Sequence, residues 1–163
     1  MNNHYGKWNL FKRPYVKNIL SALAVAAGGF VLLNLTFLFN FLVFQVIDFF
    51  IPRNPEFGPP QYFPLARHAL FLIIIALISW AVFRTRLRPL LKAIFMTVPT
   101  AVVLVTIGIM LYPSPVLPYL VGAVLTISVL FYFYRTKRPW LYYYSVVLVA
   151  LALMVFTLMG GEI

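Results

Sequence analysis

Residues 18–47 read NILSALAVAAGGFVLLNLTFLFNFLVFQVI, thirty residues in a row without a charged side chain. A helix needs about 20 predominantly apolar residues to cross the hydrocarbon core of a bilayer. The run is about twice the length of the apolar core of a secretory signal, and its Ala-x-Ala patterns lie at its start. We therefore expect it to remain on the mature protein as a membrane-spanning helix.

The rest of the chain repeats this pattern. Of the 163 residues, 63% are hydrophobic and 10% are charged, whereas soluble domains carry about 25% charged residues. Short connecting segments separate the apolar runs and leave no room for a separate soluble domain. The sequence predicts one all-helical integral membrane domain over residues 1–163. Its five transmembrane spans are expected at about 18–50, 65–83, 90–112, 116–134 and 139–160.

Basic residues are distributed unevenly between the two sides of these spans. Eleven of the 13 fall on one side: Lys7, Lys12, Arg13, Lys17, Arg84, Arg86, Arg88, Lys92, Arg135, Lys137 and Arg138. Arg53 and Arg67 fall on the other side, together with all three acidic residues. Because cytoplasmic loops are rich in Lys and Arg, we expect a cytoplasmic N-terminus and an external C-terminus in a plasma membrane. The net charge of +10 then reflects membrane topology, and we predict no nucleic-acid partner.

Residues 131–144, FYFYRTKRPWLYYY, place aromatic residues on both sides of a basic turn. Tyrosine and tryptophan favour the headgroup level of a membrane, so we expect this segment to form an interfacial aromatic belt. Arg135, Lys137, Arg138 and Trp140 are the predicted contacts with anionic lipid headgroups, which attract each basic residue by about 1 kcal/mol. A specific lipid or sterol site at this turn remains open as an alternative.

The second half of the first helix carries an unusual number of polar residues for a membrane span. Asn34, Gln45 and Asp48 fall within about 60° of one another at 100° per residue, whereas Asn40 lies on another face. Two polar faces predict protein neighbours on two sides, with the amides linking helices. The alternative is a polar lining for a cavity that opens to the outside, with Asp48 at its mouth.

Two further features of the sequence concern packing and the external side. Small residues gather early in the first helix and predict close packing against another helix or subunit. They are Ser21, Ala22, Ala24, Ala26, Gly28 and Gly29. On the external side, Arg67 and His68 at the start of the second helix are expected to face Asp48 and Glu56 as a polar cluster.

Residues for catalytic or metal chemistry are scarce. The chain has no cysteine, two histidines and three acidic residues. The topology places His4 and His68 on opposite faces of the membrane, which excludes a bis-histidine haem or a histidine metal cluster within one chain. We predict no catalytic residue, no metal site and no cofactor. An enzyme would require Asp48, Glu56 and His68 to act together at the outer surface.

These observations leave two main hypotheses for function. The first is a non-catalytic subunit or scaffold of a larger membrane complex, which follows from the missing catalytic residues and the two polar faces of the first helix. The second is a small homo-oligomeric transporter or channel for lipid or polar solutes, which follows from the polar upper half of that helix. Membrane lipids and either another membrane protein or further copies of the chain are the expected partners.

Overall fold

The computed structural model describes residues 14–50, 63–111, 113–114 and 116–159. These residues form five helices and no strand. The helices are α1 (Pro14–Phe50), α2 (Phe63–Arg84), α3 (Pro89–Met110), α4 (Leu117–Arg135) and α5 (Trp140–Leu158). The prediction of an all-helical fold is confirmed for these residues, and each predicted segment contains one helix.

Four of the helices are long and apolar enough to cross a membrane: Tyr15–Phe49 within α1, Pro89–Met110, Leu117–Arg135 and Trp140–Leu158. They indicate an integral membrane protein. The apolar stretch in α2, His68–Arg84, is shorter. At 37 residues, α1 is about 55 Å long, well beyond a hydrocarbon core of about 30 Å.

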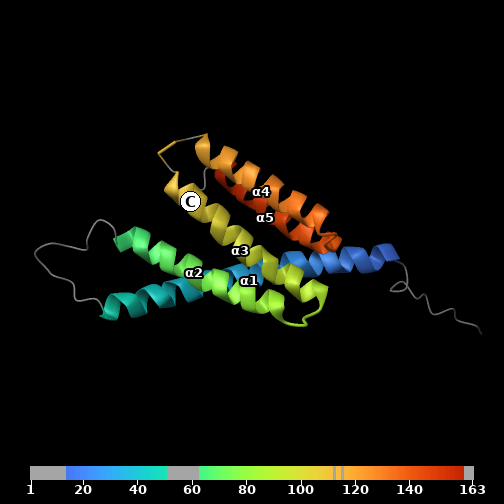
Figure 1. Ribbon diagram of the computed structural model, residues 1–163, viewed down its shortest axis with the longest axis horizontal. Coiled ribbons are helices and arrows are strands. Elements are labelled where there is room, and N and C mark those ends of the chain that lie inside the picture. Colours follow the sequence, from blue (N-terminus) through green and yellow to red (C-terminus); the bar gives the residue numbers. More distant parts are fainter. Residues whose placement is uncertain (1–13, 51–62, 112, 115, 160–163) are drawn as a thin grey trace, which may run out of the picture.

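Consecutive helices run in opposite directions (Figure 1). Along α1 and α2, ring contacts join Phe39 to Phe71 and Phe44 to His68, so the two helices are antiparallel. The start of α1, the α2–α3 connection and the α4–α5 connection consequently lie at one end of the bundle (Figure 1). We call this the basic end, because its described residues include eight basic side chains: Lys17, Arg84, Arg86, Arg88, Lys92, Arg135, Lys137 and Arg138.

α3 is the central helix and contacts each of the other four. Its small residues Ala93, Thr97 and Ala101 follow one another at intervals of four and are all buried. Such a row lies along one side of a helix and lets neighbouring backbones approach closely. The α1 and α5 helices pack against α3 more extensively than α2 and α4 do.

The contact between α1 and α3 depends on two glycines. A Cβ atom at Gly29 would lie 2.8 Å from Cγ2 of Thr97, and one at Gly28 would lie 3.1 Å from Cγ2 of Ile94. One turn earlier, Val25 is fully buried in a cluster with Ala93 of α3 and Leu141 of α5. The small-residue patch predicted on the first helix is therefore a packing surface, and the helix that it meets is α3.

A buried hydrogen bond joins α5 to α3. The Oγ of Ser145 lies 2.7 Å from the backbone carbonyl of Ala93 and 2.8 Å from that of Leu141, and its hydroxyl can donate to either. Ser145 is 0% exposed. Hydrocarbon contains no water that could replace this hydrogen bond. The bond therefore favours one position of α5 along α3.

Candidate functional site

The polar residues predicted on the first helix are divided between two environments. Asn34 and Gln45 are exposed, whereas Asn40 and Asp48 are half-buried. Asn34 Nδ2 donates a hydrogen bond of 2.8 Å to the carbonyl of Phe30, one turn earlier in the same helix. The structure therefore does not bring these four side chains together around one cavity; Asn34 and Gln45 face outward.

Asn40 faces the interior of the chain. It lies one turn from Thr36, which lines a groove shared with α2 and α3. It also lies one turn from Phe44, which packs against the buried cluster of Phe71, Ile75 and Val98. Its Oδ1 atom is buried and has no hydrogen-bond partner among the described residues, and the same holds for Oγ of Ser79 in α2. An unsatisfied buried acceptor costs about 1–3 kcal/mol. The inner side of α1 around Asn40 thus packs against the chain itself, although Oδ1 of Asn40 lacks a hydrogen bond among the described residues.

The external polar cluster is described only in part. His68 is half-buried, and its ring meets the ring of Phe44 edge-on at 6.0 Å. Asp48 is half-buried one turn beyond Phe44. Glu56 and the side chain of Arg67 lie outside the described residues, so the proximity of all four groups stays a prediction.

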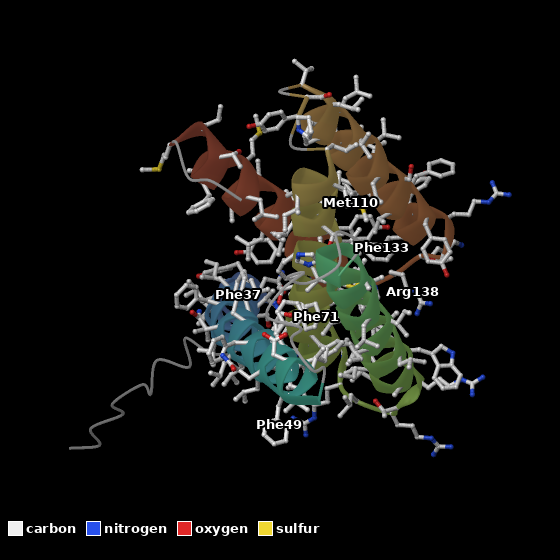
Figure 2. All side chains as sticks on the ribbon, turned by 90° about the vertical axis from the view of Figure 1, so that its left-hand side faces the viewer. Phe37, Phe49, Phe71, Met110, Phe133 and Arg138 are labelled. Atoms are coloured by element: carbon white, nitrogen blue, oxygen red, sulfur yellow. The ribbon has the colours of Figure 1, made fainter. Side chains whose placement is uncertain are left out.

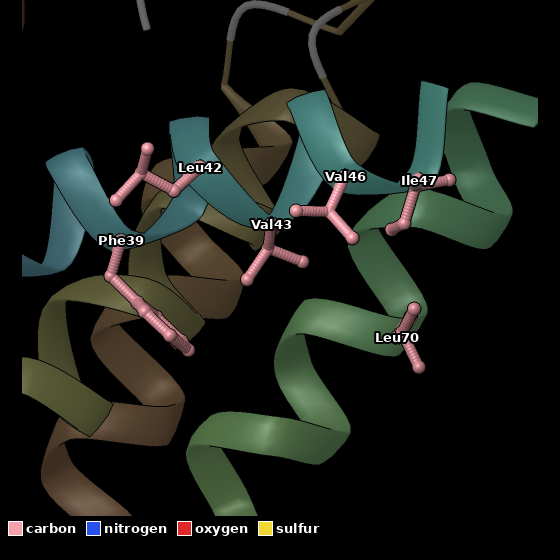
Figure 3. Close-up of a pocket in the computed structure, with 6 residues that line it drawn as sticks. All are labelled: Phe39, Leu42, Val43, Val46, Ile47 and Leu70. Carbon is pink, nitrogen blue, oxygen red and sulfur yellow. The ribbon is translucent and has the colours of Figure 1, made fainter. Parts of the chain in front are cut away.

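The hollows found between α1 and α2 are apolar. One groove of about 300 Å³ is lined by Phe39, Leu42, Val43, Val46 and Ile47 of α1 and by Leu70 of α2 (Figure 3). A second, of about 170 Å³, lies between α1, α2 and α3 beside Thr36. Hydrocarbon walls of this kind accommodate lipid chains and offer nothing to a polar solute.

The predicted headgroup residues lie on a well-defined turn between α4 and α5. Arg135, Lys137, Arg138 and Trp140 are all exposed. The amide of Arg138 donates to the carbonyl of Phe133 at 3.0 Å, and that of Lys137 donates to Tyr134 at 3.2 Å. These two bonds form a Schellman motif, whose left-handed position is usually glycine. Lys137 occupies that position with φ of 51°, so a cation is kept where a glycine would be less strained.

Replacing Lys137 with glycine is expected to raise the free energy of unfolding by about 1 kcal/mol, because glycine adopts a positive φ without the clash of a Cβ atom. Lys137→Val is expected to lower it by at least as much, since a β-branched residue tolerates this conformation poorly. Thermal unfolding in detergent, followed by helical circular dichroism, measures both. Equal stability of the two variants would show that the turn does not hold this conformation.

Part of the 131–144 segment is buried, contrary to the expected interfacial belt. Phe133 is 5% exposed and Tyr142 is 6% exposed, whereas Tyr134 and Trp140 are exposed. The Phe133 ring meets the rings of Tyr142 and Tyr143 edge-on at 5.9 and 5.7 Å, and Phe83 of α2 meets Tyr142 at 6.4 Å. Phe83, Phe133, Tyr142 and Tyr143 thus form an aromatic cluster that joins α2, α4 and α5. The belt interpretation is wrong for Phe133 and Tyr142 because these residues point toward neighbouring helices and not toward lipid.

Within the part of the chain that the structure describes, no group of three or more His, Cys, Asp or Glu side chains is placed to hold a metal ion. Two features therefore remain as candidate functional surfaces, the exposed side of α1 and the basic end. Comparison with known proteins adds no further candidate, because no protein-family model, curated protein or solved structure matches this chain.

Proposed function

We propose that this protein is a non-catalytic subunit or scaffold of a larger membrane complex, in which the exposed side of α1 docks a helix of a partner protein. The observation that carries the proposal is Asn34, an amide exposed on an apolar helix of membrane-spanning length. Polar side chains on such helices face protein far more often than lipid.

The amide of Asn34 has more hydrogen-bonding capacity than its own helix uses. Nδ2 carries two donors and Oδ1 two lone pairs, and one donor is engaged by the Phe30 carbonyl. Lipid tails offer no partner for the remainder. A hydrogen bond to a neighbouring membrane helix stabilises association by about 0.6–2 kcal/mol. The surroundings of Asn34 therefore favour a partner helix over lipid.

The side chains on either side of Asn34 have the spacing of a helix–helix interface. Exposed residues follow at intervals of four and three along the middle of α1: Leu23, Ala27, Phe30, Asn34, Phe37 and Phe41. We call this row the α1 seam. Figure 2 shows Phe37 on the outer side of α1, where it is 65% exposed. Alternation of three and four residues marks the contact line of a left-handed helix pair, and one asparagine in that line specifies its register.

The proposal includes five membrane spans with a cytoplasmic N-terminus. The 22 residues of α2 extend about 33 Å, enough to cross a hydrocarbon core. The alternating direction of the helices and the basic residues gathered at one end support this topology. With the basic end in the cytoplasm, the α1 seam begins near the inner surface and Asn34 lies within the bilayer.

The alternative, a homo-oligomeric transporter or channel, has less support. The grooves described between α1, α2 and α3 are lined almost entirely by apolar side chains. The polar residues Asn34 and Gln45 face outward, so a polar path would have to be completed by a second copy of the chain. A transporter would therefore assemble through the same seam, and the composition of the assembly distinguishes the two functions.

The test is native mass spectrometry of the protein extracted from its own membrane in mild detergent, comparing wild type with Asn34→Leu and Ser128→Leu. Ser128 is the matched control, because it is an exposed polar residue on α4 whose Oγ donates to the carbonyl four residues earlier at 2.7 Å. We expect a second protein in fixed stoichiometry, and Asn34→Leu should weaken its retention by about 3- to 30-fold. Ser128→Leu should retain it as wild type does.

Three outcomes would contradict the proposal. A wild-type protein recovered as a lone monomer would remove the complex altogether. Assembly made only of copies of this chain would favour the homo-oligomeric alternative. Equal retention by Asn34→Leu and wild type would show that the α1 seam is not the docking surface.

A further inference from the structure

The two connections at the basic end have similar sequences. Residues 84–89 read RTRLRP and residues 135–139 read RTKRP. Each segment contains Arg, Thr, another basic residue, Arg and Pro in that order. One connection joins α2 to α3 and the other joins α4 to α5.

Each segment begins at the last residue of one helix and reaches a proline at the start of the next, because Pro89 is the first residue of α3 and Pro139 directly precedes α5. Arg84 is the last residue of α2, and Arg135 is the last residue of α4. The hydroxyl of Thr85 donates to the carbonyl of Val82 at 2.6 Å, and that of Thr136 donates to the carbonyl of Tyr132 at 2.8 Å. Each threonine thus satisfies a carbonyl of the last helical turn. The basic side chains around it remain exposed.

Both turns are attached to the aromatic cluster. Phe83 directly precedes Arg84, and its ring lies 6.4 Å from that of Tyr142, whose ring lies 5.9 Å from that of Phe133, two residues before Arg135. Nζ of Lys92 in α3 donates to the carbonyl of Phe83 at 2.8 Å. These contacts connect both turns to one aromatic cluster at the same end of the bundle (Figure 1), and their exposed side chains together make up a basic surface.

This surface has a large uncompensated charge. Six basic side chains are exposed on the two turns: Arg84, Arg86, Arg88, Arg135, Lys137 and Arg138. Among the residues that the structure describes, Asp48 is the one acidic residue, and it lies near the far end of α1. Like charges repel one another, so the binding of an anion to these side chains is favoured.

The position of the surface favours lipid phosphate as that anion. Trp80 is 60% exposed, and the guanidinium of Arg84 lies 4.3 Å from the centre of its ring. Trp140 and Tyr134 are exposed beside the other turn. Tryptophan and tyrosine belong at the headgroup level of a membrane, where phosphate groups lie. Arginine binds such oxygens with paired hydrogen bonds.

We propose that the two turns together bind the headgroup of an anionic lipid that carries two phosphates, one phosphate at each turn, as cardiolipin-type lipids do. Because both turns are joined to one aromatic cluster, the second contact is intramolecular once the first has formed. The site is formed by the ends of α2 to α5 and does not involve the α1 seam, so it is independent of the proposed docking of a partner.

The test measures lipid retention by native mass spectrometry after release from phosphatidylcholine nanodiscs. One set of nanodiscs contains cardiolipin, and the other contains phosphatidylglycerol at equal total phosphate. We expect the wild-type protein to retain cardiolipin about tenfold more strongly than phosphatidylglycerol. Neutralising either turn should remove this preference. One variant changes Arg84, Arg86 and Arg88 to glutamine, and the other changes Arg135, Lys137 and Arg138. Lys17→Gln is the matched control, because Lys17 is exposed at the same end but outside both turns, and it should keep the preference.

Even if a neutralised turn impairs insertion, the retention of cardiolipin and phosphatidylglycerol by the wild-type protein tests the proposal. The single changes Arg84→Gln and Arg138→Gln, one in each turn, are milder variants. Equal retention of the two lipids at equal phosphate would overturn the proposal, because it would show ordinary surface attraction. Complete displacement of cardiolipin by inorganic pyrophosphate at the same phosphate concentration would also overturn it, in favour of a soluble phosphate ligand. An equal effect of Lys17→Gln would show that the two turns have no special role.

Discussion

Replacing Gly29 with alanine is expected to lower the free energy of unfolding by about 1–2 kcal/mol, and replacing it with leucine should separate α1 from α3. The added Cβ would lie 2.8 Å from Cγ2 and 3.1 Å from Oγ1 of Thr97. Thr97 is 1% exposed, and its Oγ1 donates to the carbonyl of Ile94 at 2.7 Å. Thr97 therefore cannot rotate away easily, and the clash outweighs the gain of about 0.5–1 kcal/mol that alanine normally brings within a helix.

The matched control is Gly122→Ala in α4, where the added Cβ would lie 3.5 Å from Cδ2 of Leu104, an ordinary contact. This change should leave stability unchanged or raise it. Thr97→Ala should restore the Gly29→Ala protein, because it removes both of the nearest atoms. The double-mutant cycle should give a coupling energy of about 1 kcal/mol or more. Additive effects of the two changes would show that α1 does not pack on α3 at this position.

Much of the helical framework could be predicted from the sequence, because charge and proline mark helix ends in a membrane protein. Arg88 and Pro89 mark the start of α3, and Arg138 and Pro139 directly precede α5. Glycine and alanine in α1 likewise indicated a packing surface. The same signal is present in α3, where Ala93, Thr97 and Ala101 follow at intervals of four.

The burial of the aromatic residues could not be predicted in the same way. In a soluble helix, polar residues mark the outer side, but a membrane helix is apolar on both its lipid side and its protein side. Phe131 and Phe133 are the same residue type, two positions apart, yet they are 64% and 5% exposed. Helix geometry places them on opposite sides of α4, but nothing in the local sequence says which side is buried. The aromatic cluster depends on which helices are neighbours, and this information lies in tertiary packing.

Because Phe133 is buried, its replacement is expected to have a large effect on stability. Phe133→Ala is expected to lower the free energy of unfolding by about 1–3 kcal/mol, since each of its edge-on contacts with Tyr142 and Tyr143 contributes about 0.5–1.5 kcal/mol. The stabilisation that Phe133 contributes includes no free energy of transfer from water, because lipid tails are as apolar as the protein interior. Thermal unfolding in detergent, with tyrosine and tryptophan fluorescence as a local signal, measures the change.

Phe131→Ala is the matched control for Phe133→Ala. It removes the same side chain from the same helix at a position that faces outward, so stability should change by less than about 0.5 kcal/mol. Because the aromatic cluster also holds the two basic turns together, Phe133→Ala should weaken the preference for a two-phosphate lipid while leaving every basic residue in place, and Phe131→Ala should not. If the two variants lost stability equally, Phe133 would not be a core residue. If Phe133→Ala lost stability but kept the lipid preference, the turns would be positioned by contacts other than the cluster, such as the bond from Lys92 to Phe83.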